Sequence, residues 1–322
     1  MIGRFPSTLL KVRGIHQLRG IITTTRPLLV RAITTQVQAP YFCSVNGTPN
    51  ANPTVSVFDT SFQRGNGVFE VVRVLPGGML RAVNLHLDRL ERSCEFTKCP
   101  LPPRDTLQKW LQEAATQGGE GSVRLMATQG APDGMGEPSV FIMWQPHPTW
   151  AKTVSLLPIL APWHPAGHWD TTKWLSYGPN VRSTSLAVDE GFTDALLLAH
   201  ALPGATQLET SIGNMYVLDG PNFAVGWFSQ DKLHFPCWKK LGLLQSTTQV
   251  LAAKAAQEVL QIPVEEGVYR LSDILQADEA FVMSSTRGII PVDTIGTKSF
   301  PSGPLIPQLQ NALEEMVATM PA

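Results

Sequence analysis

Residues 67–96, GVFEVVRVLPGGMLRAVNLHLDRLERSCEF, indicate how this chain of 322 residues folds. The first half holds two runs rich in β-branched and apolar residues, which favour strands, on either side of a Pro-Gly-Gly turn at 76–78. In the second half, Asn84 can cap a helix in which Leu87 and Leu90 recur at helical spacing. Two strands followed directly by a helix predict a mixed α/β (α+β) fold.

The alternation of strands and helices continues along the chain. An Asn-Gly turn at 46–47 separates a strand at 41–45 from a second one at 54–59. Elsewhere, apolar residues at helical spacing predict helices, and short apolar runs that end at turn residues predict strands. The expected helices lie at 105–119, 180–190, 245–262 and 304–320, and further strands at 122–128, 139–144, 153–160, 193–199, 207–218, 223–228 and 279–285.

Composition and charge exclude several classes of protein. A hydrophobic content of 43% and a charged content of 16% are typical of a globular chain. The net charge of −1 argues against a nucleic-acid or membrane-surface binder, and no apolar run approaches the roughly 20 residues of a membrane span. The cysteines form no Cys-x-x-Cys pair, and a proline and a glycine separate His164 from His168, so no metal site is expected.

The first 40 residues differ in composition from the rest of the chain. They contain five arginines, one lysine and many threonines, and the first carboxylate of the whole sequence is Asp59. A segment rich in arginine and hydroxyl residues and free of acidic ones is typical of an organelle transit peptide. Residues 1–40 are therefore expected to be a disordered transit peptide for a plastid or a mitochondrion. The alternative is a basic tail on a cytoplasmic protein.

A change in composition also suggests where the remainder of the chain divides. Residues 145–165 are rich in proline and tryptophan, as a connection between two halves would be. We expect a smaller N-terminal α/β domain at 41–148, a connection at 149–165 and a larger C-terminal α/β domain at 166–322.

Residues suited to one kind of chemistry are scattered along the chain. The usual glycine-rich phosphate loops, the Gly-x-Ser-x-Gly motif and the His-Glu-x-x-His motif are absent from the sequence. Hydroxyl residues at 246–248 open a helix, whose free N–H groups favour a phosphate, and Arg89 could add bidentate contacts. Lys173 could form a Schiff base, and Glu209 could keep a pyridine ring protonated. Singly each has an ordinary structural explanation, but together they are what a pyridoxal phosphate enzyme needs.

The order and wording of these segments resemble the fold-type IV pyridoxal phosphate enzymes, also called class IV aminotransferases. This family includes branched-chain aminotransferases, D-amino acid aminotransferases and aminodeoxychorismate lyases, and the resemblance covers about residues 41–300. The segments that carry it are VSVFDTSFQRGNGVFEVVRV (55–74), HLDRL (86–90), KWLSYGPNV (173–181), LETSIGNMYVL (208–218), LGLLQSTTQ (241–249) and ADEAFVMSSTRGIIPV (277–292).

The resemblance implies a two-domain architecture with pyridoxal 5'-phosphate between the domains. It makes Lys173 the catalytic Schiff-base lysine, Tyr177 a neighbour of the cofactor's phenolic oxygen, and Glu209 the partner of the pyridine nitrogen. The substrate-binding residues it implies are Phe69 and Arg124. The residues it assigns to the cofactor phosphate are Arg89, Thr247, Thr248, Ser285 and Thr286.

The chain also departs from the family pattern. Thr210 stands where the family has a glycine after the glutamate, and Ser246-Thr247-Thr248-Gln249 replaces Gly-Ile-Thr-Arg. The Arg-x-His carboxylate trap of the familiar bacterial D-amino acid aminotransferases is missing, and Phe69 replaces a tyrosine. Arg124 matches the substrate-side arginine of the branched-chain enzymes better.

The resemblance implies an aminotransferase that moves an amino group between an amino acid and a 2-oxo acid. One alternative is an aminodeoxychorismate lyase, which releases p-aminobenzoate and pyruvate for folate synthesis. Another is a relative that binds cofactor without catalysis. Small-molecule substrates and a homodimer are expected, with no metal, nucleic acid or membrane.

Overall fold

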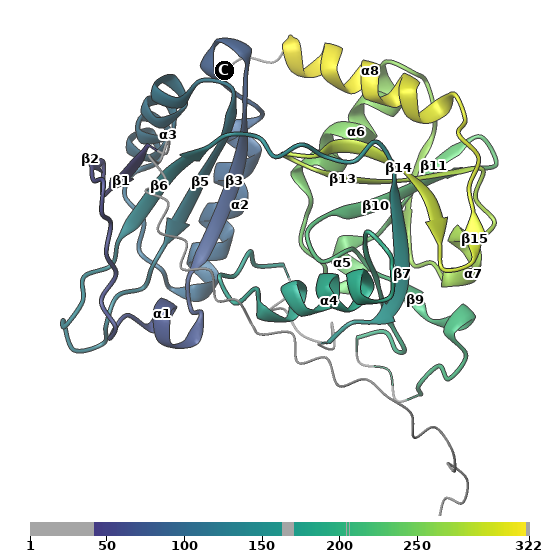
Figure 1. The fold of residues 1–322 in the computed structure, drawn as a ribbon, viewed down its shortest axis with the longest axis horizontal. Helices are drawn as coiled ribbons and strands as arrows, with labels where there is room; N and C mark the ends of the chain where they lie inside the picture. Colours follow the sequence, from purple (N-terminus) through teal and green to yellow (C-terminus); the bar gives the residue numbers. More distant parts are fainter. Residues whose placement is uncertain (1–41, 163–170, 204, 206, 320–322) are drawn as a thin grey trace, which may run out of the picture. The chain divides into compact units, whose positions relative to one another are not determined.

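Two β-sheets with helices packed against them form the part of the chain that the structure describes (Figure 1). The computed structural model describes residues 42–162, 171–203, 205 and 207–319. The predicted transit peptide at 1–40 lies outside these residues, as do His164 and His168. The prediction of a mixed α/β (α+β) fold is confirmed, because strands and helices alternate along the described chain.

The first sheet is antiparallel throughout and has the strand order β2-β1-β6-β5-β3-β4. Helices α2 and α3 bury their apolar stripes against it, so that Leu87, Leu90, Leu107 and Leu111 are almost fully buried. The elements of this half are β1 (Cys43–Val45), β2 (Thr48–Pro49), α1 (Thr60–Arg64), β3 (Val68–Leu75), η1 (Pro76–Gly78), β4 (Met79–Leu80), α2 (Val83–Thr97), α3 (Arg104–Gly118), β5 (Gly121–Ala127) and β6 (Val140–Gln145).

The second sheet has nine strands in the order β12-β11-β10-β13-β14-β7-β8-β9, with β15 paired to β14. It is mixed, because β7 runs parallel to both β8 and β14 whereas β10 and β13 are antiparallel to their neighbours. Its strands are β7 (Val154–Leu160), β8 (Asp194–Ala199), β9 (Tyr216–Val217), β10 (Ala224–Ser229), β11 (Lys232–Pro236), β12 (Val264–Gly267), β13 (Glu279–Ser284), β14 (Gly288–Ile295) and β15 (Lys298–Ser299).

Helices cover the second sheet and bury its apolar strands on both faces. Helices α6 and α8 pack together over β13, and α4 packs on β8 and β7. Strand β8 is buried at all six positions, which explains the apolar run ALLLA that follows Asp194. The helices of this half are α4 (Gly178–Asp189), η2 (Ile212–Asn214), α5 (Trp238–Leu241), α6 (Thr247–Glu258), α7 (Leu271–Ile274) and α8 (Leu305–Ala318).

Most of the elements expected from the sequence are present, and three expectations need correction. Asn84 does not cap α2, which begins at Val83 after the N-cap residue Ala82. The segment 54–59 is not a strand. Its last residue, Asp59, caps α1 instead, and its side chain accepts a hydrogen bond of 2.7 Å from the Ser61 N–H. Within 207–218 only β9 is a strand, because the preceding residues form loops and η2.

The first sheet ends at Gln145 and the second begins at Val154. The predicted division into domains at 41–148 and 166–322 remains a prediction. No helix of the described residues has the length and apolar character needed to cross a membrane.

We expect Gly226→Ala to destabilise the protein by about 1–3 kcal/mol, because overpacking a filled core forces neighbouring groups to shift. A methyl group at Gly226, in β10, would lie 2.5 Å from the Phe235 ring and 2.7 Å from the Phe281 ring. The free energy of unfolding, measured by urea denaturation, gives the loss. Gly213→Ala in η2 is the control, because a methyl group there meets nothing within 4 Å. Equal stability of the two variants would contradict this packing.

Candidate active site

Residues of both sheets line one pocket of about 900 Å³. Phe69, Arg89 and Arg124 come from the half that holds the first sheet, and Ser285 comes from the second sheet's β13–β14 turn. Lys173, in the segment that leads into α4, also lines the pocket. The pocket therefore brings together residues that are more than 200 positions apart in the sequence.

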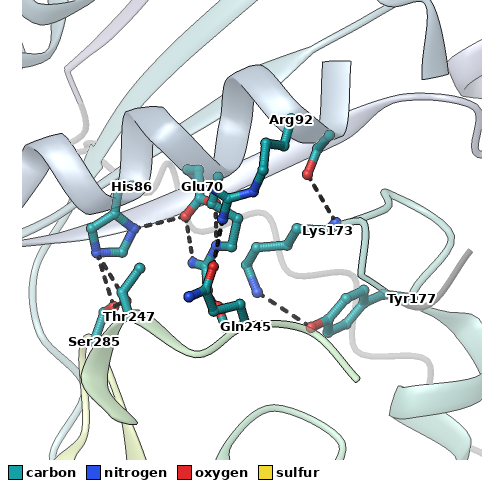
Figure 2. A network of polar contacts seen from close by, with 10 residues as sticks. Glu70, His86, Arg92, Lys173, Tyr177, Gln245, Thr247 and Ser285 are labelled. Atoms are coloured by element: carbon teal, nitrogen blue, oxygen red, sulfur yellow. Dashed lines mark hydrogen bonds and ion pairs between the residues drawn. The ribbon is translucent and has the colours of Figure 1, made fainter. Parts of the chain in front are cut away.

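The backbone around Lys173 is bound to the edge of β3. The Phe69 N–H donates to the Lys173 carbonyl at 2.9 Å, and Trp174 forms an isolated bridge with Val68. The Lys173 Nζ lies 3.5 Å from the Tyr177 hydroxyl (Figure 2). It also lies 4.5 Å from the centre of the Phe69 ring. No carboxylate of the described residues forms an ion pair with Lys173. Its amine is half-buried beside two aromatic rings and has no counter-ion within the part of the chain that the structure describes.

Arg89 is held rigidly by a buried carboxylate. Its Nε and Nη2 donate to the two oxygens of Glu70 at 2.6 and 2.7 Å, and its Nη1 donates to the Gln245 carbonyl at 2.8 Å. Burial by itself would raise the pKa of Glu70, but Arg89 and, to a smaller extent, His86 outweigh it and hold this pKa well below its usual range. Arg89 therefore connects β3 and α2 with the loop before α6.

His86 extends this network to two hydroxyl groups. Its Nδ1 lies 2.7 Å from Glu70, and its Nε2 lies 3.1 Å from the Ser285 hydroxyl and 3.4 Å from that of Thr247 (Figure 2). Burial lowers the pKa of His86 despite the opposing effect of Glu70. A neutral imidazole that donates from Nδ1 to Glu70 presents Nε2 as an acceptor for the two hydroxyls.

The N-terminus of α6 has the properties of an anion site. The Ser246 side chain caps the helix by accepting a hydrogen bond of 3.2 Å from the Gln249 N–H. The N–H groups of Thr247 and Thr248 belong to the first turn and have no partner within the helix. Ser246, Thr247, Ser285 and Thr286 line the pocket, whereas the Thr248 side chain is buried and is not among the lining residues.

Two arginines lie where a substrate could reach them. The Arg124 guanidinium lies 5.0 Å from the centre of the Phe69 ring and forms no ion pair among the described residues; burial lowers its pKa. Phe69 in turn packs edge-on against Tyr177, with ring centres 5.1 Å apart. Arg287, which the sequence analysis missed, also lines the pocket. Its guanidinium lies 4.6 Å from the centre of the Trp150 ring and 5.1 Å from that of Phe223.

The structure does not bring Glu209 to the pocket. Its carboxylate accepts a hydrogen bond of 2.8 Å from Arg270, and Glu209 is not among the lining residues. Asp219 does line the pocket, and burial raises its pKa to about 8. The sequence analysis missed Asp219 although a signal was present: Gly220 follows it, as the family pattern requires after its acidic residue, whereas Thr210 follows Glu209.

The described residues contain no group of three or more histidines, cysteines or acidic residues placed to hold a metal ion. The pocket thus offers an amine, an anion site, three arginines and a partly buried acid.

Comparison with known proteins identifies the family. The model for "Amino-transferase class IV" matches residues 67–295. A protein named aminodeoxychorismate lyase from Vibrio harveyi is 24% identical over 84% of this chain and 98% of its own length. A chloroplastic D-amino-acid transaminase from Arabidopsis thaliana is 26% identical over 80% of this chain and 69% of its own.

Solved structures agree on the fold. A hypothetical aminotransferase from Mycobacterium tuberculosis, in its PLP-bound form, superposes with a TM-score of 0.76 at 21% identity, over 87% of this chain and 99% of that one. A 4-amino-4-deoxychorismate lyase from Pseudomonas aeruginosa gives 0.68 at 23% identity, over 85% and 98%. Because the family model spans most of the chain, from the start of β3 to the end of β14, this protein belongs to the class IV aminotransferases and has their fold-type IV architecture.

Proposed function

We propose that this protein is a pyridoxal-phosphate-dependent aminotransferase that moves an amino group between an amino acid and a 2-oxo acid, with the cofactor bound to Lys173. The observation that carries the proposal is the Lys173 amine, which lines the pocket without a counter-ion among the described residues. An amine that is not committed to an ion pair can act as a nucleophile and as a base.

The residues around the pocket fit this cofactor. The free N–H groups at the start of α6 and the hydroxyls of Thr247 and Ser285, which lie 3.2 Å apart, suit a phosphate group. Arg89, fixed by Glu70, adds positive charge at the same wall. We assign Ser246 and Thr286 to this phosphate site as well, and Thr248 through its backbone N–H group only.

When bound, pyridoxal phosphate supplies an aldehyde that reacts with amines and a ring that accepts electrons released from the substrate. The protein's own part is to position these groups and to move protons. With the cofactor bound, the Lys173 amine would act as the base that moves the proton between the substrate's α-carbon and the cofactor's C4′ carbon. Tyr177 and Phe69 hold the lysine side chain in place and keep water from it.

We assign the substrate's carboxylate to Arg124. Its guanidinium faces the same pocket, and its charge has no partner among the described residues. Burial lowers its pKa despite the opposing effect of Tyr177, so a carboxylate that binds there would supply an ion pair.

A second candidate reaction is that of an aminodeoxychorismate lyase. The relative of this name from Vibrio harveyi matches along 98% of its own length. Both reactions need a lysine, a phosphate site and a substrate carboxylate site, and these are the features of the pocket on which the first proposal rests.

The attachment of the cofactor to Lys173 is tested with borohydride. We expect the purified protein, mixed with pyridoxal phosphate and reduced, to carry one covalent cofactor on the peptide that contains Lys173, because reduction fixes the bond to the lysine. Mass spectrometry locates the label. Lys173→Ala should carry none. Lys152→Ala, which removes a lysine between the two sheets, should be labelled like the wild type. Labelling of Lys173→Ala at the wild-type level would refute the proposal.

Product analysis separates the two reactions. If the protein is an aminotransferase, an L- or D-amino acid given without oxo acid leaves the cofactor in its pyridoxamine form, which absorbs at shorter wavelength. A lyase given aminodeoxychorismate instead releases p-aminobenzoate and pyruvate, and its cofactor returns to the pyridoxal form. Spectra and chromatography after a single turnover read both outcomes, and turnover of aminodeoxychorismate alone would replace the first proposal by the second.

We also propose a homodimer imported into an organelle. Exposed apolar side chains, among them Phe62 on α1 (64% exposed) and Val181 on α4 (60%), lie on neighbouring elements, because Ser176 before α4 donates to the Arg64 carbonyl at the end of α1. A relative from Arabidopsis thaliana is named as chloroplastic. A monomeric mass by light scattering, or a cytoplasmic full-length fluorescent fusion, would count against the respective proposal.

A further inference from the structure

Asp219 is held at the pocket wall by its backbone. It follows β9, and its carbonyl accepts a hydrogen bond of 2.9 Å from the Leu197 N–H in β8, while the Leu218 N–H donates to the Leu197 carbonyl at 2.9 Å. Gly220 comes next, and a methyl group there would lie 2.0 Å from the Phe223 ring. The chain therefore passes close to the Phe223 ring, which would have to shift for a larger residue, and the two backbone hydrogen bonds hold Asp219 at the wall.

The carboxyl group of Asp219 has no side-chain partner among the described residues, although most of it is removed from water. Part of the side chain opens onto the pocket, and protein atoms surround the rest. No ion pair or side-chain hydrogen bond of the described residues reaches it, and burial alone raises its pKa to about 8. An acid in this state favours a ligand that brings a positive charge or a hydrogen-bond donor. The other charged residues that line the pocket are Arg89, Arg124, Lys173, Asp194 and Arg287, and none forms an ion pair with Asp219.

Glu209 is in the opposite situation. Arg270 donates to its carboxylate at 2.8 Å and also donates to the Asn214 carbonyl at 2.8 Å. The Arg270 guanidinium further stacks on Tyr216, 5.2 Å from its ring centre. Glu209 thus already has a cationic partner, which fixes the loop before β9, and it does not line the pocket.

We propose that Asp219, and not Glu209, accepts the hydrogen bond from the protonated ring nitrogen of the cofactor. The assignment rests on the proposed function, since it requires pyridoxal phosphate in the pocket. It also explains why an acid stands in the pocket wall without a partner of its own. Asp219 is then a catalytic residue, because its negative charge keeps the ring nitrogen protonated and the ring able to accept electrons.

The test compares pyridoxal phosphate with an analogue in which a C–H group replaces the ring nitrogen. We expect the wild type to bind the natural cofactor about ten- to hundredfold more tightly than the analogue, which corresponds to one hydrogen bond between charged groups. In Asp219→Asn the ratio of the two dissociation constants should fall towards one, and in Glu209→Gln it should stay at the wild-type value. Quenching of tryptophan fluorescence measures all six dissociation constants.

The possible outcomes separate this inference from the proposed function. If Asp219→Asn keeps the wild-type ratio, or Glu209→Gln loses it, the assignment to Asp219 is wrong while cofactor binding stands. If the wild type binds neither compound, the proposed function fails and the assignment fails with it. Each ratio is taken within one variant, so a general loss of affinity does not affect the comparison.

The stability of the cofactor-free protein gives a second readout. The folded pKa of about 8 lies above the ordinary value of 3.8, so between these values the folded state binds more protons than the unfolded state and stability falls as the pH rises. The Asp219→Asn variant has no carboxyl group to titrate at this position, so its stability lacks this pH dependence. The Tm of the variant minus the Tm of the wild type should therefore increase from about pH 5 to about pH 8. Parallel pH profiles of the two proteins would show that Asp219 is not an unpartnered buried acid and would overturn the inference.

Discussion

The ion pair between Glu70 and Arg89 is the interaction on which the rest of the site depends. Glu70 lies on β3 and Arg89 on α2, both are buried, and the two side chains meet through a pair of short hydrogen bonds. Removing two charges from water costs several kcal/mol per ion, and only close, fully bonded geometry compensates for it. His86 completes that geometry on the second oxygen of Glu70. One carboxylate thus orients two of the α2 side chains that reach the second half of the chain.

These two side chains contact the loops that form the anion site. Arg89 holds the Gln245 carbonyl just before α6, and His86 meets the hydroxyls of Thr247 and Ser285. The edge of β3 also binds the lysine segment, since the Leu175 N–H donates to the Gly67 carbonyl at 2.9 Å. The amine and the phosphate-binding groups are therefore positioned by the same strand and by the helix that follows it. This arrangement fits a reaction with a phosphate-bearing cofactor, in which the lysine amine must face the reactive atom. The phosphate group at the other end of the cofactor would fix where that atom lies.

The sequence was sufficient for those parts of the fold that local patterns determine. The helices at α2, α3, α6 and α8 show apolar residues at helical spacing, and the structure places them within a few residues of the expected ends. The segment 54–59 shows the alternation of a strand, but a strand also needs a neighbour to pair with, and none is available there. That requirement is not visible in a single segment of sequence.

The same distinction separates the site residues that sequence patterns could locate from those they could not. Arg89 lies on the same helix face as His86, three positions away, so its direction follows from the helix. Glu209 and Asp219, two acidic residues ten positions apart, lie on either side of the two-residue strand β9. The glycine after Asp219 is a weak signal, and the pairing of β9 with β8 is what holds Asp219 at the pocket wall. The position of Arg287 could not be predicted from the sequence, because it depends on the packing of the turn between β13 and β14 beside Trp150 and Phe223.

The two candidate reactions differ in what the protein must do after the first proton transfer. A transaminase would have to deliver that proton to the cofactor, whereas a lyase would have to let a leaving group depart from the substrate. The groups proposed to hold the cofactor would serve both reactions equally, so they cannot decide between them. The decision belongs to the substrate side of the pocket, where Arg124 and Phe69 come from the first sheet and Arg287 from the second. Proteins that share the residues proposed to hold the cofactor but differ on the substrate side of the pocket can therefore differ in reaction while they bind the cofactor in the same way.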